Sequence, residues 1–411
     1  MRITWLEMKK ALFAPTILIL LALFTLFNIF TIVSSSYAKD ELTIANMIVE
    51  KYGDTFNDDV LRVMQEDLNA DAQKFDAQFN DANTFLEAMN YEKYDAATVS
   101  EQQEIDRISL MQMYIASGES LDERYAALDI ETLKKWIIAD YGFTGWSADF
   151  MTKEYDKVND RLAEMKETGE YKEWFFAANY RMHSELFRYL MKNIAMEGVL
   201  LVVLLTALIT NYEFEHRTQL VTYATKKGRH LMRNKLVASL LSTLLVLLPL
   251  FGLSLLTFFT VYDYSGLWKT LISSGLNWEY RWPYITWWPV ELWQYLLLAI
   301  VILVVTLLII SILTFCVSTF IKNSYISWIL CILLLVSMFV VPSFFNGIPT
   351  LLLAMQLNLT LLLLNPHMYF NGMSDLTMFE YHEIWTLTLW LFISVCCTVF
   401  TFRRFKRKDI V

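Results

Sequence analysis

The acidic, soluble part of this chain contains no cysteine. All four cysteines occur in apolar runs: Cys316, Cys331, Cys396 and Cys397. A disulfide framework, which many small secreted domains use, is therefore excluded for residues 39–190, and cysteine content does not indicate a redox compartment. For the adjacent pair 396–397, packed apolar thiols are favoured over palmitoylation.

Signatures of catalysis and nucleotide binding are also missing. The chain has no Gly-x-x-x-x-Gly-Lys-Ser/Thr loop, so it cannot be its own ATPase of that kind. The five histidines show no metal-ligand spacing, and no Gly-x-Ser-x-Gly motif occurs. The apolar runs hold no spaced pair of acids suited to an intramembrane protease. We therefore expect no enzyme, no catalytic residue, no metal site and no cofactor bound by this chain.

Charge is sparse and unevenly placed. Of 411 residues, 55% are hydrophobic and 19% are charged, which indicates an integral membrane protein with a soluble part. Residues 39–185 contain 32 acids and 15 bases, a balance of −17, whereas the rest has 11 and 19, a balance of +8. This distribution is typical of an extracellular domain with cytoplasmic basic flanks. No basic face accompanies the soluble block, so no nucleic-acid partner is expected.

Six apolar runs are long enough to cross a hydrocarbon core of about 30 Å. For the first run the alternative is a signal peptide, because residues 36–38 resemble a cleavage site, but the run is too long for the apolar region of a typical signal peptide. The predicted spans are 11–33, 194–212, 236–261, 296–320, 327–345 and 384–402.

The C-terminal stretch RRFKRK (403–408) determines the expected topology. It carries five bases in six residues and should lie in the cytoplasm. A seventh span at 348–364 would put it outside, so we interpret segment 346–366 as a re-entrant or interfacial helix on the outer side, bracketed by prolines. The predicted fold is an all-α polytopic membrane protein with six spans, a re-entrant helix before span six and a helical ectodomain between spans one and two. Both termini are expected in the cytoplasm of a cell-membrane protein.

The soluble block shows helical periodicity throughout. The predicted organisation is an interfacial helix and span one in 1–38, an extracellular helical domain in 39–190, and spans two to six in 191–411. Within the domain, a glycine-containing turn is expected at 142–146. The expected helices are 58–89, 101–115, 121–141, 150–167 and 171–191, the last running into span two.

The loop 213–235 between spans two and three carries six basic residues. Its sequence predicts a helix of roughly nine residues that has Thr218 as its N-cap and ends at Gly228. Glu213 and Glu215 lie just before this helix, where the positive end of the helix dipole favours acidic residues. A capped, charged helix in this place suits docking to another protein. The alternative is a basic loop that only anchors two spans by the positive-inside rule.

Residues 1–10 predict an amphipathic interfacial helix. Trp5, Leu6 and Met8 are expected in the membrane interface, with the charged residues, including Glu7, Lys9 and Lys10, in water.

Three further residues are candidates for a substrate path. Glu197 is an acid near the outer end of span two, where acids are functional candidates, but reaching water or pairing with Arg188 or Lys192 is an alternative. Trp287 and Trp288 belong to an aromatic stretch, 262–293, for which anchoring at the head-group level is the alternative.

Together these features resemble the permeases of ABC-2-type transporters. Glu213-x-Glu215-x-x-Thr218 is similar to the acid-rich approach to the family's coupling helix. Lys227-Gly228-Arg229, followed by Lys235, is similar to its basic exit. Trp5-Leu-Glu7-Met-Lys9-Lys10, then Pro15, resembles the interfacial helix before span one. The family often has glycine before the threonine, where this chain has Arg217. The resemblance covers the membrane parts, and the large insertion is similar to that of permeases with large ectodomains.

The resemblance implies an exporter subunit driven by a separate ATPase chain, which would bind ATP and magnesium. It also implies a second permease subunit, identical or related, and contact with membrane lipid. Expected substrates are an antimicrobial peptide, a lipid-like compound or an ion. Two alternatives remain, a membrane receptor or sensor and a peptide-immunity scaffold without transport. The implied ATPase-docking residues are Glu213, Glu215, Arg217, Thr218, Leu220, Tyr223, Lys227 and Arg229.

Overall fold

The computed structural model describes residues 2–35, 39–174, 183–224, 231–279, 282–345 and 347–407. Lys227 and Arg229 lie outside these ranges, as do residues 36–38. Among the described residues, six helices are long and apolar enough to cross a membrane, which confirms the all-α polytopic class. They are α2 (Pro15–Ser34), η3 (Ser184–Met191) continuing into α11 (Lys192–Glu215), α13 (Leu231–Val261), α14 (Leu292–Ile321), α15 (Ser324–Val340) continuing into η5 (Val341–Phe345), and α18 (His382–Arg407).

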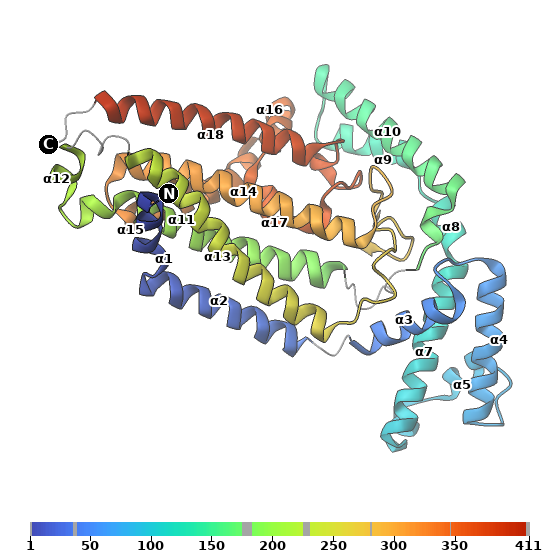
Figure 1. The fold of residues 1–411 in the computed structure, drawn as a ribbon. Coiled ribbons are helices and arrows are strands. Elements are labelled where there is room, and N and C mark those ends of the chain that lie inside the picture. The colour runs from blue at the N-terminus through green and yellow to red at the C-terminus, as the bar shows by residue number, and fades with distance from the viewer. Residues whose placement is uncertain are drawn as a thin grey trace.

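The six spans form one bundle with the helical domain at one end (Figure 1). At the opposite end lie α1 (Arg2–Leu12), α12 (Gln219–Ala224) and the last turns of α18. We call these the domain end and the α12 end. Helices α15 and α18 leave broad apolar faces exposed, whereas most of α11 is buried. Exposed apolar faces of this size are expected where lipid takes the place of water.

Span one begins four residues later than the sequence predicted. Pro15 is the first residue of α2, and Ala14 before it has an extended backbone. Proline suits the first helical position because the N–H it lacks has no partner there, while it disfavours helical geometry in the residue before it. The chain therefore turns between α1 and α2, and α1 is a separate helix.

The helical domain is more finely divided than the sequence predicted. The single helices expected at 58–89 and 121–141 are both wrong, because a short polar side chain caps a new helix inside each: Asp81 accepts the Thr84 N–H at 2.8 Å and Asp129 accepts the Thr132 N–H at 3.0 Å. The domain comprises α3 (Lys39–Tyr52), α4 (Asp58–Phe75), α5 (Ala82–Ala88), α6 (Tyr91–Ala96), α7 (Val99–Glu119), α8 (Leu121–Ala126), α9 (Ile130–Asp140), α10 (Trp146–Thr168) and η2 (Glu170–Lys172).

The chain breaks at residues 141–145, in agreement with the predicted turn at 142–146, but α10 begins at residue 146, four residues before the helix predicted at 150–167. Gly145 precedes the helix with φ 53°, and Gly169 follows it with φ 73°, in the left-handed region that glycine adopts without a steric cost. The helix predicted at 171–191 is wrong at its start, because the 3-10 turn η2 ends at Lys172 and Glu173 has an extended backbone that pairs with Thr55. Residues 175–182 are outside the described ranges, and the part from Ser184 onward continues into α11 as predicted.

A buried ion pair joins the helical domain to the bundle. Arg161 of α10 contacts both carboxylate oxygens of Glu170 at 2.5 and 2.6 Å, and its Nε donates to the Thr286 carbonyl at 2.9 Å. Glu170 also accepts the Ser273 hydroxyl. Both charged side chains are buried. Arg161 therefore connects α10 to the loop between α13 and α14.

Replacing Arg161 by Met is expected to lower stability by about 3–5 kcal/mol, because Glu170 would remain buried without its cation. The measurement is the thermal unfolding midpoint of the purified chain, which should fall by several degrees. The control is Arg62→Met: Arg62 pairs with Glu66 at 2.9 Å, but both side chains are exposed, so the loss should stay below about 1 kcal/mol. Equal shifts in the two variants would contradict this account.

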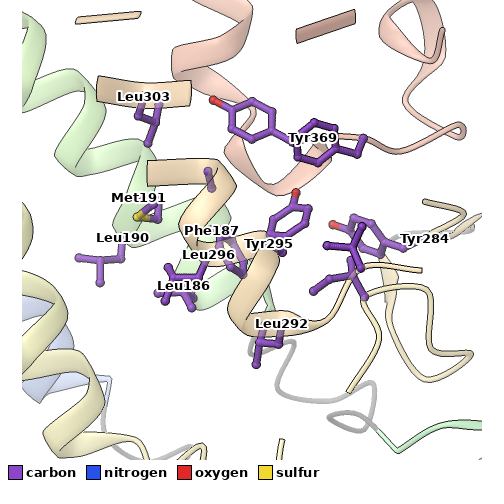
Figure 2. Packing of buried hydrophobic residues seen from close by; sticks show 14 of the residues in the cluster. Leu186, Phe187, Leu190, Met191, Tyr284, Leu292, Tyr295, Leu296, Leu303 and Tyr369 are labelled. Carbon is purple, nitrogen blue, oxygen red and sulfur yellow. The ribbon is translucent and has the colours of Figure 1, made fainter. Parts of the chain in front are cut away.

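Aromatic and aliphatic side chains form the bundle core at the domain end (Figure 2). Phe187 of η3 and Tyr295 of α14 pack edge to face with ring centroids 4.7 Å apart. The Tyr295 hydroxyl donates to the Pro366 carbonyl at 2.8 Å, and the Tyr369 hydroxyl donates to the Leu362 carbonyl. The core thus fixes the segment after residue 345 against spans two and four.

That segment contains two helices too short to cross a bilayer. They are α16 (Pro349–Met355) and α17 (Leu359–Leu364). Helix α17 packs against α11, α14 and α15, which agrees with a re-entrant segment buried in protein. Short 3-10 turns follow at η6 (Pro366–Met368) and η7 (Asp375–Thr377), and the only described strands are β1 (Trp278–Glu279) and β2 (Trp282–Pro283).

Candidate functional site

The connection between α11 and α12 is a tight reversal of the chain. Helix α11 ends at Glu215, and Arg217 has φ 56°, in the left-handed region. The N–H of Thr218 donates to the Glu213 carbonyl at 2.9 Å, which satisfies a terminal carbonyl of α11. The Thr218 carbonyl accepts the Thr222 N–H at 3.0 Å, so Thr218 occupies the N-terminal position predicted for it. Its hydroxyl donates back to the Glu213 carbonyl at 3.5 Å.

Four charged side chains meet beneath this reversal. We call Glu7, Lys10, Glu213 and Lys235 the ion-pair cluster. The Lys10 ammonium lies 2.6 Å from Glu7 Oε1 and 2.7 Å from Glu213 Oε1. The Lys235 ammonium pairs with the other oxygen of Glu213 and lies 3.7 Å from Glu7 Oε2. Two carboxylates and two ammonium groups make the cluster neutral, and it joins α1, α11 and α13.

Lys235 is fully buried at the start of α13. Besides Glu213, its ammonium donates to the backbone carbonyls of Ile209 and Thr210 at 2.5 and 3.0 Å. An ammonium group has three donors, and each has an acceptor here. A buried cation costs several kcal/mol of desolvation unless it is paired and hydrogen-bonded in this way. Removal of any one of the four charged side chains of the cluster is therefore expected to destabilise the other three.

Tyr223 connects α12 to the cluster. Its ring is buried, and its hydroxyl lies 3.4 Å from Glu213 Oε2 and 3.8 Å from the Met232 sulfur. The ring packs edge to face on Phe405 of α18, with centroids 5.2 Å apart, and lies 5.8 Å from Phe214. Through this one side chain, α12 contacts α11, α13 and α18.

The charge state of the cluster follows from its surroundings. Burial alone would lower the pKa of Lys10, but hydrogen bonds to Glu213 and Glu7 outweigh it, and the pKa is raised. Lys10 also lies 4.6 Å from the centre of the Tyr212 ring. Burial, together with the nearby carboxylates of Glu213 and Glu7, raises the pKa of Tyr223 well above its ordinary value. At neutral pH the lysine is charged and the tyrosine is neutral.

The structure corrects part of the predicted docking surface. Glu213 and Tyr223 were expected to contact a partner, but both are buried, because α11 and α12 fold back over them and the cluster takes up the carboxylate. Leu220 is exposed as predicted, and Val221 beside it, which the sequence analysis did not single out, is 78% exposed. Glu215 and Arg217 are exposed as well. Glu215 also accepts the Ser324 N–H at 2.7 Å, at the start of α15.

The N-terminal helix α1 buries a different face from the one that the sequence predicted. Trp5, Leu6 and Lys9 are exposed, as an interfacial helix requires. Glu7 and Met8, however, are buried, and Lys10 points inward to Glu213. The expectation that all the charges face water was wrong, because α1 packs against α11 and α13 and presents this face to the cluster.

The structure does not bring the three substrate-path candidates together. Glu197 is buried in α11 and accepts the Asn28 amide of α2 at 2.7 Å, and that amide lies 3.2 Å from Ser254 of α13. The described hydrogen-bond partner of Glu197 is thus Asn28. Trp287 and Trp288 lie at the domain end instead, where Trp288 packs on Phe370 and Tyr381. The polar contact of Asn28 and Ser254 was missed, since single polar residues in apolar runs give little signal.

No known protein family, curated protein or solved structure matches this chain. Within the described ranges, no group of three or more His, Cys, Asp or Glu side chains is placed to hold a metal ion. The arrangement of the residues must therefore carry the functional argument.

Proposed function

We propose that this chain is the permease subunit of an ABC-2-type exporter, which moves a substrate outward with energy from a separate ATPase chain. One observation carries the proposal. The short helix α12 presents exposed Leu220 and Val221 on one side, and on the other its Tyr223 reaches the ion-pair cluster that joins α1, α11 and α13. Because α12 contacts the spans through Tyr223, it is suited to transmit a displacement from a docked partner to the spans.

The backbone at Arg217 supports the same reading. This is the position where ABC-2-type permeases often have glycine, and in this chain it has φ 56°. Glycine adopts that conformation without the cost borne by other residues. Arg217 therefore holds a conformation that glycine would adopt at no steric cost.

In the proposed mechanism, the ATPase binds ATP and magnesium and closes beneath α12. The displacement passes through Tyr223 to Glu213, and from there to Lys10 and Lys235. Because buried ion pairs resist separation, α1 and the adjoining ends of α11 and α13 move together. A second permease subunit, identical or related, completes the pathway. Substrates of the proposed exporter are an antimicrobial peptide, a lipid-like compound or an ion.

The Val221→Asp variant tests the docking surface. The chain carries an affinity tag and is purified from its native membranes, and ATP hydrolysis in the purified material is measured. A carboxylate at the centre of an apolar contact costs about 2 kcal/mol or more, so bound ATPase activity should fall at least about tenfold. The control is Val99→Asp at the opposite end of the molecule, since Val99 is 72% exposed, and it should retain the bound activity.

Two results would contradict the proposal. One is the absence of ATP hydrolysis in material from the unmodified chain, which would favour the receptor or the immunity scaffold. In the scaffold, protection against a peptide would persist when ATP hydrolysis is blocked. The other is equal loss in Val221→Asp and Val99→Asp, which would show that α12 is not the docking surface.

A further inference from the structure

A cavity of about 700 Å³ lies where the helical domain meets the bundle. Helix α10 forms one wall, and α16 and the first turn of α18 form the other; these elements meet at the upper right of Figure 1. The volume falls within the range of small-molecule sites, roughly 300–1,000 Å³. We call this cavity the junction pocket. None of the residues predicted from the sequence to bind a partner or substrate lines it.

The walls of the junction pocket are apolar and largely aromatic. Trp146 and Phe150 of α10 stack with ring centroids 5.5 Å apart. Leu353 of α16 lies in the opposite wall, with Tyr381 and Trp385 at the start of α18. Trp146, Tyr381 and Trp385 are exposed. Trp385 lies in the first turn of α18, and tryptophan at the end of a span favours the head-group level of a bilayer. We therefore expect the pocket to open near the depth where acyl chains meet head groups.

The polar rim of the pocket has an excess of negative charge. Lys157 lies 2.8 Å from Glu154 and 3.3 Å from Glu380. The N–H of Glu380 donates to the second oxygen of the buried Glu154 carboxylate at 3.0 Å. Two carboxylates and one ammonium leave a net charge of −1. The rim belongs to a domain whose residues 39–185 have a balance of −17, so the surrounding field attracts cations and repels anions.

We propose that the junction pocket binds a cationic amphiphile, with its hydrocarbon chain between the aromatic walls and its ammonium group beside Glu380. Apolar walls provide affinity for the chain. The acidic rim and the exposed tryptophan faces favour a cation at the mouth. An anionic head group would meet two carboxylates. Lys157, the one cation among the described residues that line the pocket, is already shared between them. The proposal concerns binding alone and requires neither transport nor an ATPase.

The test measures saturable binding of tritiated dodecyltrimethylammonium to the full chain in lipid nanodiscs, with empty nanodiscs as the baseline. Unlabelled dodecyltrimethylammonium, dodecyl maltoside and dodecyl sulfate compete; they share the chain length and differ in head-group charge. The cationic competitor should displace the probe at a concentration at least tenfold lower than either of the others. Equal displacement by the maltoside or the sulfate would overturn the proposal.

Three variants locate the site. Ala354→Trp places a large side chain in the pocket from an exposed position, and should weaken binding at least tenfold without disturbing the core. Its control is Ala126→Trp, an exposed alanine of α8, which should bind normally. Glu380→Gln should weaken the cationic probe several-fold and leave dodecyl maltoside unaffected. Unchanged binding in Ala354→Trp, or an equal loss in Ala126→Trp, would show that the amphiphile binds elsewhere.

Discussion

Replacing Lys235 by Met is expected to destabilise the protein by about 3–5 kcal/mol. The substitution removes the cation that pairs with Glu213 and lies 3.7 Å from Glu7. The cluster would then consist of Glu7, Lys10 and Glu213. Two carboxylates and one ammonium group would leave one buried negative charge uncompensated. The thermal unfolding midpoint and the yield of monodisperse protein should both fall sharply.

Two further variants test whether charge is the cause. Lys9→Met removes a lysine from the exposed face of α1, one residue before Lys10, and should have little effect. The double variant Lys235→Met/Glu213→Gln restores a neutral cluster of Glu7 and Lys10, and should be more stable than Lys235→Met alone. A double-mutant cycle of these two substitutions, Lys235→Met and Glu213→Gln, is expected to give a coupling free energy on the order of 2 kcal/mol. If the two substitutions were simply additive, the ion-pair account would be wrong.

The membrane architecture could be predicted from the sequence because its signal is local. A run of about 20 apolar residues identifies a span wherever it lies in the chain, and all six predicted spans are present as helices. Helix ends in the soluble domain depend on single polar residues such as Asp81 and Asp129. Such residues are common in an acidic domain, so those that cap a helix do not stand out.

The interior of the candidate site could not be predicted, because its contacts join residues far apart in the chain. Lys10 and Glu213 are separated by 203 positions. In its own stretch of sequence, each of these residues is typical of a charge exposed to water. Glu213 becomes buried only when α1 and α13 pack against α11. The docking role of the motif at 213–218 stays a prediction, and its first acid, Glu213, lies inside the protein. Glu215 and Arg217 of the motif are exposed, as are Leu220 and Val221 of α12.

The Tyr223→Ala variant is expected to separate ATP hydrolysis from transport. The Tyr223 side chain forms the contact between α12 and the ion-pair cluster. Truncating a buried aromatic residue lowers the free energy of unfolding by about 3–5 kcal/mol. Leu220 and Val221 would remain exposed for a partner. In the proposed exporter, the ATPase should therefore stay bound to the variant, while export driven by ATP falls at least tenfold. Export into inverted membrane vesicles and bound ATPase activity are measured on the same preparation.

Tyr223→Phe is the matched control, because it keeps the ring against Phe214 and Phe405 and removes only the hydroxyl near Glu213. It should retain most of the export activity, since the 3.4 Å hydroxyl contact is long and the ring provides most of the packing. A cooperative thermal unfolding transition and a single monodisperse peak in size-exclusion chromatography show that a variant is folded, even where its unfolding midpoint is lower than that of the unmodified chain. If folded Tyr223→Ala exported substrate at the normal rate with the ATPase bound, force would not pass through this side chain. The path would then have to run through Glu215, whose carboxylate accepts the Ser324 N–H at the start of α15 and so offers the other described connection from this loop to a span.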